Sequence, residues 1–345
     1  MLVCPLDWGL GHATRCIPII KEFQKRGCEV FIASSERALN LLKNEFPNLS
    51  VDQLPAYNPR YSSVLPMTLS MAMQVPKFMK VIQQEHESLK KIVEKRNIDL
   101  IISDNRYGCW SDTVKSIFIT HQLNIIVPWY LNASVKKFNS KSIANFSLCW
   151  IPDWQGEKSL TGKLSSASAS NVRYIGPLSR FTPLQGVEKQ YELLAIVSGP
   201  EPQRQEFENL LRKKLNESEK KALLVRGIPS NSIIKKVNTI DEVDFLDAIN
   251  LNRIIQASEI IICRSGYSTI MDLIKLNKNA ILVPTPGQTE QGYLANRLSE
   301  KGIMCFENQR SFNLQRALLK HDNLKSVIEL SIDTTTLSQA IGEVL

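Results

Sequence analysis

Short apolar runs alternate with helical segments along the whole chain, and the pattern restarts about halfway. In the first half the runs cover residues 1–6, 29–34, 49–54, 99–104 and 124–129. In the second half they cover residues 191–199, 221–227, 232–237, 259–266 and 279–284. Apolar, β-branched strands that alternate with helices are typical of parallel sheets covered on both faces. The sequence therefore predicts an α/β protein with two doubly wound, Rossmann-like domains that face each other across a cleft.

The domain boundaries follow from the composition of the middle of the chain. A chain of 345 residues is long enough for two domains. Residues 176–190 are rich in Pro and Gly, lack periodicity and are the expected linker. We therefore expect an N-terminal domain over 1–175 and a C-terminal domain over 191–333. A last helical segment, 334–345, can pack back on the N-terminal domain.

Composition excludes several classes of protein. Hydrophobic residues make up 43% of the chain and charged residues 22%, which is an ordinary globular balance. No stretch approaches the roughly 20 apolar residues of a membrane-spanning helix, and no signal-peptide pattern opens the chain. The seven cysteines include no CxxC pair, so neither a disulfide framework nor a zinc ribbon is expected. We expect a cytoplasmic protein without a bound metal or resident cofactor.

The net charge of +8 favours anionic partners. The sequence contains no long Lys/Arg run and no recognisable nucleic-acid-binding motif. Phosphate-bearing small molecules or an anionic membrane surface are therefore preferred to nucleic acid.

Two turns after predicted strands in the first half carry residues suited to acid–base chemistry. Gly9 and Gly11 allow a tight turn, and His12 follows in the first turn of a helix. Asp104 ends another strand of the same sheet, where its carboxylate can fix the ring of His12. Alternatively, the glycines only shape the turn and Asp104 caps the next helix. His12 and Cys16 lie one helical turn apart, but two ligands make a weak metal site.

Two turns in the second half suit a phosphorylated sugar. The helix after Ser265 begins with the amides of Gly266, Tyr267, Ser268 and Thr269, and such amides bind anions. Asp272, one turn further, is placed to accept hydrogen bonds from a ribose. In the next turn, Glu290 and Gln291 begin a helix and suit the hydroxyls of a sugar. Ordinary helix starts with solvated polar residues are the alternative at both turns.

Taken together, the segments GLGHATR (9–15), CRSGYSTIMDL (263–273) and TPGQTEQ (285–291) resemble the GT-B nucleotide-sugar glycosyltransferases. The likeness is greatest to the MurG-like group with a family 28 C-terminal domain, and to family 1 enzymes. The resemblance implies that the C-terminal domain binds a UDP-sugar. The residues implied in donor binding are Ser198, Gly199, Ala248, Arg264, Ser265, Gly266, Tyr267, Ser268, Thr269, Asp272, Glu290 and Gln291.

By the same resemblance, His12 is the catalytic base and Asp104 its supporting carboxylate. Gly9, Gly11 and Arg106 are expected on the acceptor side. The expected activity is inverting, metal-independent transfer of a hexose or N-acetylhexosamine from a UDP-sugar to an acceptor hydroxyl. No D-x-D triplet occurs, which argues against the metal-dependent GT-A transferases. Two alternatives stay open: a nucleotide-sugar epimerase of the same fold, and a non-catalytic UDP-sugar-binding subunit.

The segment 55–83 points to the acceptor. It contains four Met residues and three basic residues but no acidic residue. Such an apolar, basic segment can dock on an anionic membrane or hold a lipid-linked acceptor. We therefore expect a glycan or lipid-linked acceptor and a peripheral position on the inner face of the cytoplasmic membrane. The alternative is a pair of core helices, because Pro66 and Pro76 divide the segment.

Overall fold

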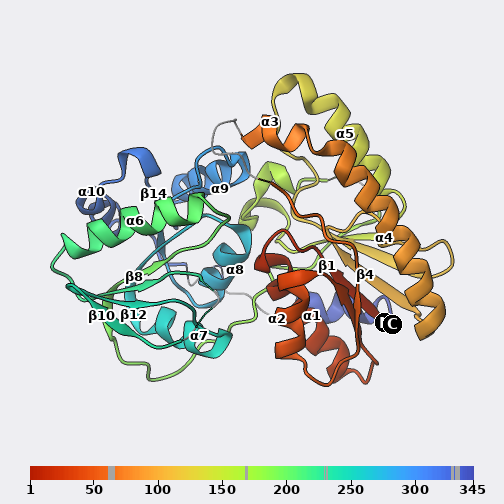
Figure 1. Cartoon of the computed structure of the whole chain (residues 1–345), viewed down its shortest axis with the longest axis horizontal. Helices are drawn as coiled ribbons and strands as arrows, with labels where there is room; N and C mark the ends of the chain where they lie inside the picture. Colours follow the sequence, from red (N-terminus) through yellow and green to blue (C-terminus); the bar gives the residue numbers. More distant parts are fainter. Residues whose placement is uncertain (61–66, 168–169, 229, 231, 328–329, 331–334) are drawn as a thin grey trace. The chain divides into compact units, whose positions relative to one another are not determined.

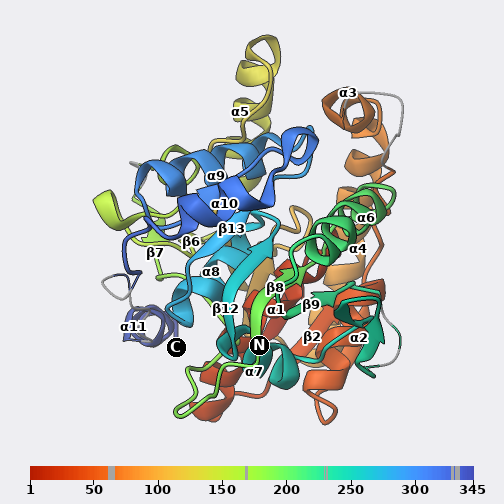
Figure 2. The same ribbon diagram turned by 90° about the vertical axis from the view of Figure 1, so that its left-hand side faces the viewer.

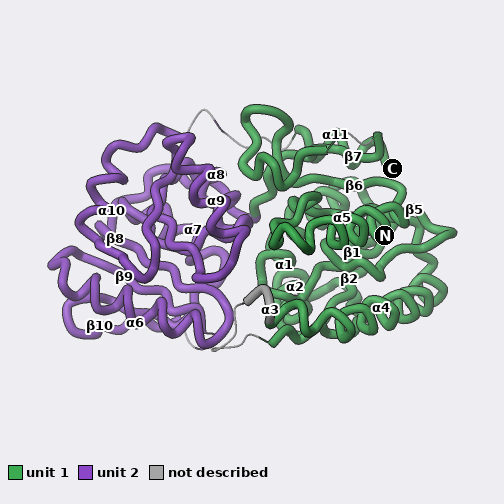
Figure 3. Tube along the Cα trace, turned by 90° about the horizontal axis from the view of Figure 1, so that it is seen from above, with its two compact units in different colours: residues 1–179, 332–345 green, residues 180–331 purple. Residues whose placement is uncertain are grey.

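The structure is a computed structural model (Figure 1), which describes all residues except 61–66, 168–169, 229, 231, 328–329 and 331–334. It divides into two compact units, coloured separately in Figure 3. Unit 1 comprises Met1–Ser179 with Ile332–Leu345, and unit 2 comprises Arg180–Ser331. The change at residue 180 falls inside the Pro- and Gly-rich segment 176–190.

Unit 1 is built on a seven-stranded sheet in the order β3-β2-β1-β4-β5-β6-β7, and every pairing is parallel. The strands are β1 (Leu2–Pro5), β2 (Phe31–Ser34), β3 (Val51–Gln53), β4 (Leu100–Asp104), β5 (Lys115–Ile119), β6 (Leu148–Ile151) and β7 (Val172–Tyr174). The helices are α1 (Leu10–Lys25), α2 (Glu36–Glu45), α3 (Met67–Ala72), α4 (Val75–Arg96), α5 (Trp129–Ile143) and α11 (Thr335–Gly342).

Apolar side chains at helical spacing hold α1 and α4 on the sheet. Ile17, Ile20 and Phe23 of α1 are fully buried. Leu89 of α4 packs into a cluster with Leu2 of β1 and other strand residues. Burying such side chains contributes about 1.5–3 kcal/mol each, which explains why these segments fold as amphipathic helices.

The C-terminal helix α11 lies on unit 1. Arg26, just after α1, donates hydrogen bonds to the backbone oxygen (2.5 Å) and the hydroxyl (2.6 Å) of Ser338. Arg173 of β7 donates to a carboxylate oxygen of Glu343 at 2.9 Å. The last residues of the chain are therefore held against the end of α1 and against β7.

Unit 2 has a second seven-stranded sheet, in the order β10-β11-β9-β8-β12-β13-β14. The strands are β8 (Tyr191–Ile196), β9 (Ala222–Val225), β10 (Lys235–Val237), β11 (Ile240–Val243), β12 (Ser258–Cys263), β13 (Ala280–Leu282) and β14 (Cys305–Phe306). The helices are α6 (Gln203–Asn216), α7 (Ala248–Gln256), α8 (Tyr267–Lys275), α9 (Thr289–Glu300) and α10 (Leu314–His321). The pairing of β10 with β11 is antiparallel, whereas the other pairings are parallel.

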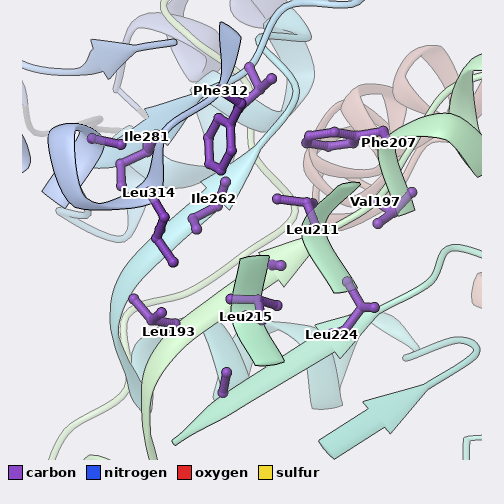
Figure 4. Close-up of a cluster of buried hydrophobic side chains, with 14 of the residues drawn as sticks. Leu193, Val197, Phe207, Leu211, Leu215, Leu224, Ile262, Ile281, Phe312 and Leu314 are labelled. Atoms are coloured by element: carbon purple, nitrogen blue, oxygen red, sulfur yellow. The ribbon is translucent and has the colours of Figure 1, made fainter. Parts of the chain in front are cut away.

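The core of unit 2 lies between its sheet and the helices α6 and α10. Figure 4 shows Phe207, Leu211 and Leu215 of α6 beside Leu193 of β8 and Leu224 of β9. All five side chains are at most 1% exposed. The sheet is thus covered on this face by a close-packed apolar layer, as a parallel sheet requires.

The prediction of two doubly wound, parallel-sheet domains is confirmed, but one predicted strand is wrong. Residues 124–129 form a loop into α5, and the exposed Ile126 and Trp129 show that this apolar run is not buried. Pro128 stands at the N-cap of α5, and a proline cannot donate to a strand ladder. The strand beside β4 is β5, at Lys115–Ile119, which was not predicted from the sequence.

Strand order locates the sites where ligands bind in such folds. In unit 1 the chain leaves β1 towards β2 and leaves β4 towards β5, on opposite sides of the β1–β4 pair. In unit 2 the same reversal occurs between β8 and β12, which run side by side in Figure 2. Crevices at the carboxyl ends of strands, where the order reverses, are the binding sites of doubly wound sheets. His12 and Asp104 lie at the first of these places, and Ser198, Gly199 and Gly266 lie at the second.

Within the described part of the chain, no helix has both the length and the apolar character needed to cross a membrane.

Candidate functional site

The turn after β1 places His12 at the β1–β4 crevice. Gly9 is the N-cap of α1 and has a φ of +141°, a conformation that strains other residues. Gly11 and His12 follow in the first turn of α1. The His12 side chain is 19% exposed, so solvent or a substrate can reach part of its ring. A residue with a side chain would be strained at position 9, so the turn requires glycine there.

His12 and Asp104 are in contact. Pro5 of β1 pairs with Asp104 of β4 in the sheet register, which brings the two turns together. Nδ1 of His12 lies 2.9 Å from Oδ1 of Asp104, and the Asp104 side chain is fully buried. The carboxylate faces the imidazole across the crevice instead of capping the next helix. The structure therefore has the histidine–carboxylate pair that the sequence predicts.

A third residue, Arg15, completes this cluster and was not predicted. Its Nε donates to Oδ2 of Asp104 at 2.5 Å, and its Nη2 donates to Oδ1. Nη2 also lies 2.9 Å from Nδ1 of His12, and Nη1 lies 3.0 Å from Nδ1 of His121. Arg15 follows His12 by three positions, so both side chains project from the same face of α1. That spacing is the signal from which Arg15 could have been found.

The charges in the cluster are strongly coupled. Burial opposes ionisation of Asp104, but Arg15 and His12 outweigh it and hold the pKa of Asp104 well below its usual range. Burial lowers the pKa of His12, and Arg15 and His121 add to this effect against the opposing influence of Asp104. At neutral pH the cluster therefore contains an ionised Asp104, a charged Arg15 and an uncharged His12, which is the form of histidine that can accept a proton.

Cys16 is a third neighbour of Asp104, with its Sγ 3.6 Å from Oδ2. Burial and the nearby carboxylate raise the pKa of the Cys16 thiol well above its usual range. It remains a protonated thiol instead of becoming a metal-binding thiolate. Among the described residues, no group of three or more His, Cys, Asp or Glu side chains is placed to hold a metal ion.

The structure corrects the placement of Arg106, which was expected on the acceptor side. Its side chain is fully buried in unit 1 and forms an ion pair with Glu85 of α4 at 2.6 Å. The guanidinium also donates to the backbone oxygen of Pro5 at 2.8 Å and to the hydroxyl of Ser35 at 2.6 Å. Arg106 therefore supports the turn after β1 from inside the unit, and its side chain is not exposed at the crevice.

In unit 2 the loops after β8 and β12 meet at the second crevice. Ile196, the last residue of β8, pairs with Cys263, the last residue of β12. Ser198 and Gly199 follow β8 and are exposed, and Gly199 has a φ of +114°. Gly266 is the N-cap of α8, so Tyr267, Ser268 and Thr269 form its first turn. The start of a helix beside a flexible-backbone loop is a favourable place for a phosphate group.

Arg264 and Ser265 occupy different places from those expected of donor-binding side chains. Arg264 is only 2% exposed and stacks on the ring of Phe207, with 3.8 Å between its guanidinium carbon and the ring centroid. It donates to the backbone oxygens of Val283 (3.0 Å) and Gln203 (3.2 Å). Burial lowers its pKa to about 10, so it stays charged at neutral pH. Arg264 thus joins the turn after β12 to the loop after β13 and to the start of α6, and its side chain is almost fully buried.

Ser265 and Gln291 fasten α8 to α9. The buried Ser265 hydroxyl donates to the backbone oxygen of Gln291 at 2.8 Å. The Gln291 side chain accepts from the amide of Thr285 at 2.8 Å and donates to the side-chain oxygen of Gln288. These hydrogen bonds shape the loop before α9.

The other expected donor residues lie on the same edge of unit 2. Asp272 is half-buried within α8, Glu290 is half-buried in the first turn of α9, and Ala248 begins α7. A hollow of about 500 Å³ opens between the loops after β13 and β14. It is lined by Pro284, Thr285, Pro286, Gly287, Gln288, Thr289, Gly292, Asn308, Gln309, Arg310 and Ser311.

Comparisons with known proteins agree with this architecture. Residues 203–332 match the model of the glycosyltransferase family 28 C-terminal domain. The calicheamicin glycosyltransferase CalG4 superposes with a TM-score of 0.68 at 10% identity, over 100% of this chain and 98% of that chain. Acinetobacter baumannii MurG gives 0.56 at 12% identity, over 99% and 93%. No curated protein matches the sequence. At such identities the structural likeness establishes the GT-B fold, and with the matched domain it confirms the predicted resemblance.

Proposed function

We propose that this chain, which has the GT-B fold and a family 28 glycosyltransferase C-terminal domain, transfers a sugar from a nucleotide-sugar donor to an acceptor hydroxyl with inversion of configuration. The observation that carries the proposal is the contact of His12 with the buried Asp104 at the β1–β4 crevice. An uncharged, partly exposed histidine held by a carboxylate is the arrangement of a general base.

The proposed mechanism is a direct displacement. The Nε2 atom of His12 takes the proton of the acceptor hydroxyl while Nδ1 stays hydrogen-bonded to Asp104. The acceptor oxygen forms a bond to the anomeric carbon, and the bond from that carbon to the diphosphate oxygen breaks, its electron pair leaving with the diphosphate. Attack from the face opposite the leaving group inverts the anomeric centre. The amides at the start of α8 supply positive potential for the departing diphosphate.

For the donor we propose a UDP-hexose or UDP-N-acetylhexosamine. In this assignment Gly266, Tyr267, Ser268 and Thr269 face the diphosphate, and Asp272 faces the ribose. Ser198, Gly199, Ala248 and Glu290 complete the donor site. The spinosyn rhamnosyltransferase SpnG, which is similar in fold, was solved with thymidine diphosphate, so TDP-sugars are the comparison for the nucleotide. SpnG gives a TM-score of 0.58 at 13% identity, over 99% of this chain and 90% of that chain.

The transferase proposal is tested with methanol as a small surrogate acceptor, since the resulting methyl glycoside cannot change its anomeric configuration in water. We expect slow formation of the methyl glycoside from a UDP-sugar, with UDP released in equal amount and undiminished in EDTA. Proton NMR of the product should show the anomeric configuration opposite to that of the donor. TDP-sugars, run in parallel, decide between the two nucleotides.

Other outcomes of this experiment identify the alternative functions. A sugar whose ring configuration changes while it remains attached to UDP would indicate an epimerase. Binding of UDP-sugar without turnover for any acceptor would indicate a binding subunit. Retention of the anomeric configuration in the glycoside would disprove the inverting mechanism.

We further propose that unit 1 docks on an anionic membrane, in the cytoplasm, to reach a lipid-linked acceptor. Large apolar side chains are exposed at the start of α4 and of α5: Met73 (68%), Val75 (51%), Met79 (45%), Trp129 (87%) and Tyr130 (66%). Both helix starts lie toward the top of unit 1 in Figures 1 and 2. These exposures favour docking over a wholly buried helix pair, although Phe78 packs into the core. Residues 61–66 of the predicted segment lie outside the described residues.

Binding to vesicles tests the membrane proposal. We expect the protein to sediment with phosphatidylglycerol vesicles at low salt and not with phosphatidylcholine vesicles. Lys77→Glu with Lys80→Glu should lower this binding more than tenfold, because each basic residue near an anionic surface contributes about 1 kcal/mol. Lys90→Glu with Lys91→Glu, exposed and further along the same helix, is the matched control. Wild-type protein that stays in the supernatant would contradict the proposal.

A further inference from the structure

Arg15 occupies an unusual position inside the pair formed by His12 and Asp104. It contacts both oxygens of the Asp104 carboxylate, and the same Nη2 lies 2.9 Å from Nδ1 of His12. Its side chain is only 2% exposed, so water does not screen its charge from the imidazole. Protonation of His12 would therefore bring two cations into contact inside the protein.

We infer that Arg15 is a positioning residue that keeps His12 uncharged and fixes which of its ring nitrogens is available to take a proton. The electrostatic part stands on the contacts of unit 1 alone, and only its catalytic consequence rests on the proposed function. A buried carboxylate on its own stabilises the imidazolium beside it and raises the pKa of the histidine, so the base would already be protonated when the acceptor binds. Arg15 neutralises the charge of Asp104 and opposes this rise in pKa.

The charged and titratable groups around His12 all act in a defined direction. Asp104 from β4 favours the charged ring, whereas Arg15 from α1 and His121, which follows β5, disfavour it. Cys16, also on α1, contacts Asp104 as a neutral thiol and adds no charge. Arg15 lowers the pKa of His12 in two ways: it repels the imidazolium, and it neutralises the carboxylate of Asp104. Removing Arg15 abolishes both effects, so the pKa of His12 is expected to rise.

Two groups approach Nδ1 of His12 at 2.9 Å: Asp104, which is ionised and only accepts hydrogen bonds, and Nη2 of Arg15, which only donates. In the inferred arrangement Nδ1 carries the hydrogen, in a bond to Asp104. The opposite tautomer, in which Nδ1 accepts from Arg15, would overturn this part of the inference. Arg15 provides donors on the other sides of the same carboxylate and holds it in place. Nε2 then carries the lone pair, and Nε2 is the atom that takes the acceptor proton in the proposed mechanism.

Nuclear magnetic resonance of the histidine rings tests this inference without any activity. The chain contains four histidines, so the His12 signals can be assigned by comparison with His12→Gln. In Arg15→Met we expect the titration midpoint of His12 to move to higher pH, whereas in the wild-type protein nitrogen shifts should show hydrogen on Nδ1. Lys25→Met removes an exposed positive charge from the same helix and should leave the midpoint unchanged.

A second variant keeps the test decisive if Arg15→Met does not fold. Arg15→Lys retains the charge but cannot contact Asp104 and His12 together with a planar fork, so we expect a smaller shift in the same direction. A midpoint that stays unchanged, or falls, in the folded variant overturns the inference.

Activity adds an independent readout. We expect the acidic limb of the kcat/KM profile to move with the His12 midpoint, so that the variant loses rate at low pH and recovers it at high pH. If the wild-type protein transfers no sugar while the midpoint shifts, the proposed function fails and the inference stands. If transfer occurs and the midpoint does not move, the inference fails and the proposed function stands.

Discussion

Replacing His12 by Gln is expected to lower kcat for sugar transfer about 10²–10⁴-fold, the usual contribution of a positioned general base. Glutamine has a similar size and can still donate to Asp104, but it cannot accept a proton near neutral pH. The Kd for the donor nucleotide should not change, because the proposed donor residues all belong to unit 2. Initial rates with saturating donor and calorimetric titration with UDP measure the two quantities.

Two controls separate loss of the base from loss of the fold. His321→Gln changes a histidine in the last turn of α10, outside both crevices, and should keep wild-type activity. All five tryptophans, Trp8, Trp110, Trp129, Trp150 and Trp154, belong to unit 1. Their fluorescence therefore reports whether the unit that contains His12 is folded in each variant. Wild-type turnover by folded His12→Gln would show that His12 is not the base.

The fold could be predicted because strand burial dominates the sequence of a doubly wound domain. Residues 100–102 and residues 260–263 are wholly apolar, and both runs belong to central strands. β5 was missed because Lys115 and Ser116 interrupt its apolar pattern, although only its first residue is exposed. The strand prediction for 124–129 was wrong because apolar composition alone cannot distinguish a buried strand from an exposed loop that precedes a helix.

The site could be predicted in part, for a related reason. Strand order brings the ends of β1 and β4 together, so the contact of His12 with Asp104 follows from topology. The role of Arg15 was not predicted from the sequence, because a charged residue on a helix is normally expected to face solvent. Arg106 and Arg264 carry the same lesson. Both follow strands that end at the crevices, yet both side chains turn inward to backbone oxygens, and the sequence does not indicate that direction.

The buried ion pair of Glu85 with Arg106, beneath the turn after β1, is expected to contribute strongly to the stability of unit 1. Glu85→Gln should lower the free energy of unfolding of unit 1 by roughly 3–5 kcal/mol, the usual loss when one partner of a buried pair is removed. Glu85 accepts from Arg106 at 2.6 Å, from the Tyr57 hydroxyl at 2.8 Å and from the amide of Gly108 at 3.2 Å. A glutamine in its place leaves the guanidinium of Arg106 buried, with Asp7, 3.6 Å away, as its remaining counter-ion.

Glu87→Gln is the matched control, since Glu87 is exposed two positions further along α4 and should change stability by no more than about 0.5 kcal/mol. Urea unfolding followed by tryptophan fluorescence measures unit 1 alone. Equal midpoints for the two variants would show that the pair is not stabilising. In the double variant with Arg106→Met no unpaired charge remains, so its loss should be smaller than the sum of the two single losses. Because Arg106 also holds the carbonyl of Pro5 at the end of β1, any stability lost here is lost directly beneath the turn that presents His12.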